Sequence, residues 1–80
     1  MTELQRETVM KFHYYPETDS LYIELSPALG ADAVEISPGV VIDYDQDGKP
    51  VGIDIDNASK VVDLTRLEVE ALPLKTLAFA

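Results

Sequence analysis

The sequence contains no cysteine and a single histidine, His13, in 80 residues. The absence of cysteine excludes disulfides, thiol nucleophiles, and zinc or iron–sulfur sites with cysteine ligands. A histidine beside a carboxylate can act as a general base, but no serine or cysteine nucleophile motif and no second histidine accompanies this one. A small enzyme that uses His13 is therefore the least favoured of three functional hypotheses; the other two are a protein-binding module and a weak metal-binding protein.

Basic residues are also few, with six Lys and Arg against 15 Asp and Glu and a net charge of −9. Such a charge repels phosphate backbones, so we expect no nucleic-acid binding, and a basic protein or cations are the natural partners. No apolar run approaches the ~18 residues that a transmembrane helix needs, and the first eleven residues lack the apolar core of a signal peptide. We expect a cytoplasmic protein with no membrane contact.

Apolar and polar residues alternate in five short runs, which predicts five strands separated by turn residues such as Pro16, Gly39 and Gly48. After Asn57 the period lengthens towards 3.6, which predicts a helix with Asp56 or Asn57 as its N-cap. Thr65 with Glu68 matches a second capping box, so two short helices broken near Asp63 are the alternative to one helix. The sequence thus predicts an α+β fold: a small five-stranded, mostly antiparallel sheet, a meander of hairpins, covered on one face by C-terminal helix.

Three segments follow from the same patterns. Residues 1–9 are polar without a clear period and are predicted to be a flexible leader, and residues 10–73 form the single α+β domain. Residues 74–80 are an apolar tail that we expect to pack on its own core or on a second subunit. A homodimer through this tail or through an exposed strand edge is expected.

Alternation also divides the predicted strands into an aliphatic face and an acidic face. Carboxylates that share one face of neighbouring strands repel one another, and either solvent screening or a basic partner must compensate. The predicted partner-binding residues are Asp43, Asp54, Asp56, Glu24, Glu35, Tyr22 and His13.

A second acidic pattern suggests a metal site. Asp43, Asp45, Asp47 and Gly48 match the first half of a calcium loop, in which oxygen ligands alternate before a glycine. The twelfth position is Asp54, where a bidentate Glu is usual, and the simpler interpretation is a hairpin turn. Weak calcium binding through these aspartates is the alternative hypothesis, and no other cofactor is expected.

The segments YYPETDSLYIEL and SPGVVIDYDQDGKPVGIDIDNASK resemble the YuzE-like family of small prokaryotic proteins, a domain of unknown function of the DUF2283 type. The resemblance covers roughly residues 10–64, and its motifs are turns and strand cores. It implies an α+β domain that often forms a homodimer and has no established activity. Similar proteins encoded beside small toxin-like proteins imply an antitoxin-like role. The leading hypothesis is a non-enzymatic protein-binding module that neutralises a basic partner.

Overall fold

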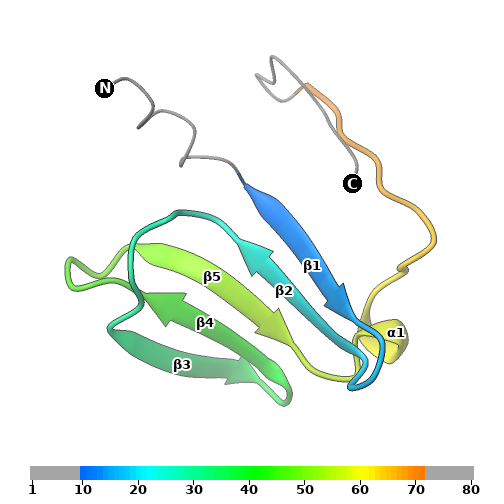
Figure 1. Ribbon diagram of the computed structural model, residues 1–80, viewed down its shortest axis with the longest axis horizontal. Helices are drawn as coiled ribbons and strands as arrows, with labels where there is room; N and C mark the ends of the chain where they lie inside the picture. The colour runs from blue at the N-terminus through cyan, green and yellow to red at the C-terminus, as the bar shows by residue number, and fades with distance from the viewer. Residues whose placement is uncertain (1–9, 72–80) are drawn as a thin grey trace.

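The computed structural model describes residues 10–71, which form one five-stranded antiparallel sheet and a single helical turn (Figure 1). The predicted leader, residues 1–9, and the predicted tail, residues 74–80, lie outside the described residues. The elements are β1 (Lys11–Tyr15), β2 (Ser20–Glu24), β3 (Asp32–Ser37), β4 (Val40–Tyr44), β5 (Pro50–Ile55) and α1 (Ala58–Val61). Every neighbouring pair of strands is antiparallel, so the predicted sheet is confirmed.

The strand order, β1-β2-β5-β4-β3, differs from the predicted meander. β1 and β2 form one hairpin, β3 to β5 form a separate meander, and β5 then pairs with β2. The connection between β2 and β3 contains Pro27 and Gly30 and is too long for a tight hairpin, so it carries the chain to the far edge of the sheet. Pairing β5 with β2 places Ile53 opposite Ile23, and Ile55 opposite Leu21, in the centre.

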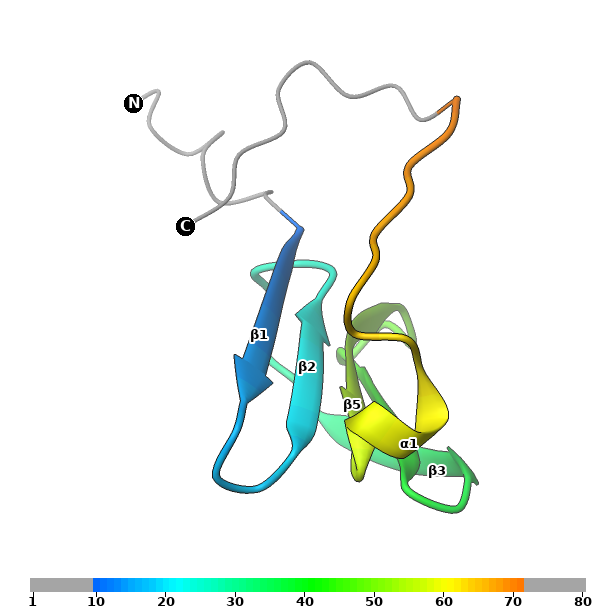
Figure 2. The same cartoon turned by 90° about the vertical axis from the view of Figure 1, so that its right-hand side faces the viewer.

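The predicted covering helix is wrong in extent, because α1 has only four residues. Val62 already has extended backbone angles, with φ −131° and ψ 159°, and residues 62–71 contain neither helix nor strand. The sheet is therefore covered by one helical turn at one end rather than by a helix across its face. Figure 2 shows α1 on one side of the sheet, followed by the extended segment.

Side-chain hydrogen bonds explain why the helix stops. Asp63 Oδ1 accepts the Thr65 backbone N–H at 2.9 Å and the Thr65 hydroxyl at 2.5 Å. This local turn offers the backbone an alternative to helical bonding. Glu68 pairs with Arg66 instead of reaching back to Thr65, so the predicted second capping box does not form.

Cross-strand register sets the two faces of the sheet. One row of apolar side chains, one from each strand, crosses the whole sheet: Phe12, Ile23, Ile53, Ile42 and Val34. α1 covers the next row, where Leu21 and Ile55 pack against the fully buried Ala58. Phe12 remains 49% exposed and Val34 44% exposed at the two ends of the first row. We call the side of the sheet that carries these two rows the apolar face.

Two irregularities interrupt the register, and both lie near strand ends. One falls between Glu35 and Ser37 in β3, which leaves Ile36 without an opposite partner in β4. The other lies in β5, where Gly52 pairs with Asp43 and Pro50 pairs with Tyr44, so that the residue between them has no opposite partner in β4. Each is a bulge of one residue, which bends a strand locally without disturbing the central pairs.

Asp19, in the turn between β1 and β2, fastens α1 to the sheet. Its backbone carbonyl accepts the Ala58 N–H at 2.8 Å, and its carboxylate accepts the Ser59 N–H at 3.1 Å and the Ser59 hydroxyl at 2.7 Å. The Tyr14 hydroxyl donates to the same carboxylate at 2.7 Å. Asp19 therefore caps the helix from 40 residues away, whereas Asn57, a predicted cap, makes no side-chain cap bond.

These bonds favour the ionised form of Asp19. The hydrogen bond from Tyr14, followed by the bond from Ser59, lowers the pKa of the Asp19 carboxyl below its ordinary value of 3.8. The same Asp19 bond raises the pKa of Tyr14. The cap is consequently strongest with a charged carboxylate and a protonated phenol.

Candidate interaction face

The side of the sheet opposite the apolar face gathers the predicted partner-binding residues. One row crosses the five strands in the order His13, Tyr22, Asp54, Val41 and Glu35. The neighbouring row contains Lys11, Glu24, Gly52, Asp43 and Ala33. Asp56 follows β5 on the same side. We call this surface the acidic face and define its carboxylates as Glu24, Glu35, Asp43, Asp54 and Asp56.

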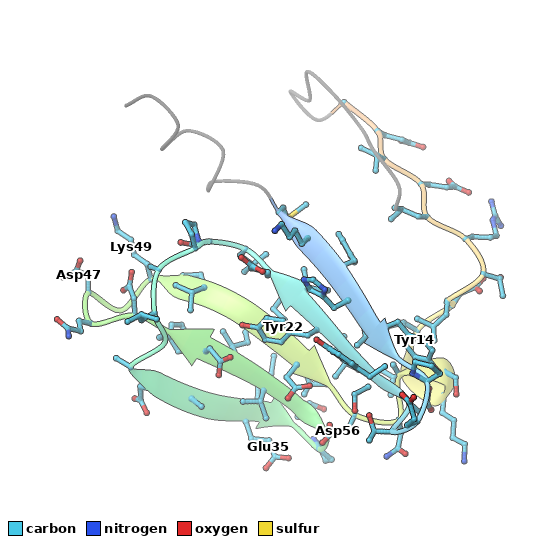
Figure 3. All side chains as sticks on the ribbon, viewed as in Figure 1. Tyr14, Tyr22, Glu35, Asp47, Lys49 and Asp56 are labelled. Atoms are coloured by element: carbon cyan, nitrogen blue, oxygen red, sulfur yellow. The ribbon has the colours of Figure 1, made fainter. Side chains whose placement is uncertain are left out.

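Tyr22 lies across the middle of the acidic face, with its hydroxyl 3.4 Å from Asp43 Oδ2 (Figure 3). Gly52 makes this position possible, because a Cβ there would lie 2.0 Å from the Tyr22 hydroxyl oxygen and 2.5 Å from the ring carbon that bears it. Desolvation, then the charge of Asp43, raises the pKa of Tyr22, so the phenol stays protonated and donates. A glycine inside a strand marks such close approaches, and that signal was readable at Gly52.

Within residues 10–71, the carboxylates in the centre of this face have no cationic side chain paired with them. The only basic side chains on the five strands are Lys11 and His13, both on the edge strand β1, and His13 Nε2 lies 3.7 Å from Glu24 Oε1. No ion pair reaches Asp54 from within residues 10–71. Desolvation, then repulsion from Asp56 and Asp43, raises the pKa of Asp54.

A family model described as a protein of unknown function, DUF2283, matches residues 11–59. This chain belongs to the DUF2283 family. The match runs from β1 into α1 and includes both ends of the Asp19–Ser59 connection as well as Tyr22 and Gly52. Comparisons with curated proteins and with solved structures found no match. None of the helical structure described in this DUF2283 chain is long and apolar enough to cross a bilayer.

The four aspartates of the predicted calcium site are divided between two places. Asp43 lies on the acidic face beside Tyr22, and Asp54 lies in the neighbouring row. Asp45 Oδ1 instead accepts the backbone N–H groups of Asp47 and Lys49, each at 2.9 Å, inside the turn between β4 and β5. In the part of the chain that the structure describes, no three or more His, Asp or Glu side chains are placed to hold a metal ion.

The turn itself is a hydrogen-bonded hairpin. The Gly48 N–H donates to the Asp45 carbonyl at 3.0 Å, and the Asp45 N–H donates to the Lys49 carbonyl at 2.9 Å. Gly48 has a φ of 80°, in the left-handed region that glycine enters without strain. Asp47 and Lys49 extend from this turn, at the end of the sheet where β4 and β5 are joined (Figure 3).

Neutralising Asp54 is expected to stabilise the free protein. A raised pKa means that the folded chain binds this proton more tightly than the unfolded chain, so stability falls as pH rises from the ordinary value of 3.8 through the raised value. Asp54→Asn removes this penalty and should raise the free energy of unfolding at neutral pH by roughly 0.2–1 kcal/mol, the scale of cross-strand charge pairs. Urea unfolding measures the difference.

The gain from Asp54→Asn should disappear below both pKa values of Asp54, because the carboxyl is then neutral in both states. Asp47→Asn makes the same change in net charge at the exposed tip of the turn and should leave the unfolding free energy unchanged. A neutral or destabilising Asp54→Asn at pH 7 would contradict the repulsion inferred on the acidic face.

Proposed function

We propose that this DUF2283 protein is a non-enzymatic protein-binding module whose acidic face binds a small basic protein, in the manner of an antitoxin. The observation that supports this proposal is the position of Asp54, in the middle strand of the sheet beside Asp43 and Asp56 and without a cation from residues 10–71. Lysine or arginine side chains of a partner would relieve this repulsion on binding. Complementary charge of this kind mainly gives specificity and fast association.

The shape of the acidic face favours a protein over a small molecule. Its side chains come from five strands of an open sheet. One shallow depression is lined by residues 35–38, and another by residues 30–33 and Asp43. Neither of these two includes His13. Tyr22 offers an aromatic ring near the centre, on which an arginine of the partner can stack while also facing carboxylates. Tyrosine and arginine are the residue types that most often anchor protein interfaces.

Affinity capture from the native cell at low salt tests this proposal directly. The test variant carries Asp43→Asn and Asp54→Asn, which remove two charges from the acidic face, and the new amide at position 43 keeps an oxygen that can accept from Tyr22. The matched control carries Glu17→Gln and Asp47→Asn, which remove two charges from exposed turns. Both variants therefore have the same net charge, and only the position of the change differs.

We expect the wild type and the control to retain a basic protein that the acidic-face variant loses. Retention should fall as salt rises from about 0.05 M, where charges act beyond 10 Å, to about 1 M, where they act over roughly 3 Å. Equal loss in both variants would show that overall charge, and not the acidic face, governs binding. Salt-independent retention by all three proteins would also contradict the proposal.

A further inference from the structure

The apolar face is left largely uncovered by the described chain. α1 covers the row that contains Leu21 and Ile55, and of the row from Phe12 to Val34 only Ile23 and Ile53 pack against that cluster within residues 10–71. Only four hydrophobic residues of that part of the chain are buried: Leu21, Val51, Ile55 and Ala58. Phe12 and Val34 at the ends of the second row are exposed and the isoleucines between them are only half-buried, and an apolar surface left open in this way marks a place that something else covers.

The chain beyond α1 leads along the same side of the sheet. In Figure 2, residues 62–71 continue from α1 on the side of β1 and β2 that carries the helix. The packing of Ala58 and Val62 against Leu21 and Ile55 identifies this side as the apolar face. Leu67 and Val69 in this segment are themselves exposed, at 53% and 37%. Figure 1 shows the same segment passing beyond the outer edge of β1, so residues 72–80 are joined to the described chain at this edge of the sheet.

The composition and length of residues 72–80 suit that face. The segment LPLKTLAFA contains four large apolar residues, Leu72, Leu74, Leu77 and Phe79, and one charged residue, Lys75. Nine extended residues reach about 30 Å at ~3.3 Å each. Five strands about 4.8 Å apart are roughly 19 Å wide between the outer strands, so the segment is long enough to cross the sheet.

Other candidates to cover the apolar face fit less well. Residues 1–9 carry Glu3, Arg6 and Glu7, which would lose hydration on an apolar surface. A second copy would have to bring its sheet to about 10 Å, and α1 stands on part of the face in the way of such an approach. Each copy also carries a net charge of −9. A covalently attached segment has the further advantage of a high effective concentration.

We infer that residues 72–80 bind across the apolar face of their own chain and complete the core over the row Phe12, Ile23, Ile53, Ile42 and Val34. The apolar side chains Leu77 and Phe79 replace water on this row. The acidic face on the other side of the sheet remains open to a partner. This inference is independent of the proposed function.

A spin label at the C-terminus tests the inference, because the chain has no native cysteine to compete for the label. Ala80→Cys carries a nitroxide in full-length protein whose Ile and Val methyl groups are ¹³C-labelled. We expect the methyl signals of Ile23, Ile42 and Ile53 to lose intensity, and those of Val41 on the acidic face to lose less. Adding Leu77→Ser and Phe79→Ser should restore the isoleucine signals while the backbone amide spectrum keeps the dispersion of a folded sheet.

Two further outcomes would overturn the inference. Equal intensity losses on both faces, or none, would mean that residues 72–80 do not bind the apolar face. A mixed sample, with the nitroxide on unlabelled chains and ¹³C on chains without nitroxide, reports binding between copies. Losses in the mixed sample as large as in the single-chain sample would assign the cover to the segment of another copy.

Discussion

Replacing Gly52 with alanine is expected to destabilise the protein by about 1–3 kcal/mol, the range for overpacking a filled site. The new Cβ would lie 2.0 Å from the Tyr22 hydroxyl and 2.5 Å from the adjoining ring carbon, so Tyr22 must leave its place across β5. It would then lose its contact with Asp43. Urea unfolding of Gly52→Ala against the wild type measures this cost.

The effect of Gly52→Ala on the free energy of unfolding should change sign when Tyr22 is absent. A Tyr22→Ala background removes the three atoms nearest to a Cβ at residue 52, and alanine is preferred to glycine within a strand because it loses less backbone freedom on folding. Gly52→Ala should therefore be neutral or stabilising there. A double-mutant cycle on the two positions gives the coupling free energy. A cost that is equal in both backgrounds would show that backbone strain, and not Tyr22, excludes a side chain at this position.

The second large effect is expected at Asp19. Asp19→Ala removes the acceptor for the Tyr14 hydroxyl and for two donors of Ser59, and it places alanine at a residue with a φ of 54°. α1 then loses its cap and its connection to the β1–β2 turn. The midpoint of urea unfolding should fall further for Asp19→Ala than for Tyr14→Phe or Ser59→Ala, each of which removes fewer bonds.

Lowering the pH should reproduce, in the wild type, part of the loss of stability expected for Asp19→Ala. The lowered pKa of Asp19 means that its stabilisation is complete above the ordinary value of 3.8 and is lost as pH falls through the lowered folded value. Asp19→Asn keeps an oxygen acceptor and tolerates the left-handed backbone, but it has no charge to lose. Its unfolding midpoint should vary less with acid than that of the wild type. An equal acid response in the two proteins would exclude Asp19 as its source.

The alternation of apolar and polar residues is sufficient to predict the sheet and its two faces, because a period of two determines which side chains lie on the same face. Alternation alone predicts that Tyr22, Asp43 and Asp54 share one face, and the register places them there. The order of the strands was not readable in the same way. Alternation gives the same pattern whether β2 pairs with β3 or with β5, and only the packing of Ile53 and Ile55 beside β2 decides it.

The helix shows where a local pattern is insufficient. Apolar spacing beyond Asn57 predicts helix as far as Pro73, as one helix or as two short ones broken near Asp63, but the structure has only four helical residues and a turn at Asp63 and Thr65 in place of a second helix. The residue that holds the remaining turn, Asp19, lies 40 positions from Ser59, so no local capping rule could identify it. Gly52 inside a strand signals a close approach in the sequence, but that Tyr22 is the group that approaches depends on its orientation in another strand.

The placement of the two bulges limits how this chain can change length during evolution. Ile36 and the bulge of β5 near Val51 each add a residue close to the end of a strand, and the pairs Tyr22–Asp54 and Ile23–Ile53 keep an unbroken register. One inserted or deleted residue in the middle of β5 would exchange Ile53 and Asp54 between the two sides of the sheet. Insertions and deletions should therefore be tolerated in the β2–β3 connection and at the strand ends, whereas the centres of β2 and β5 should change only by substitution.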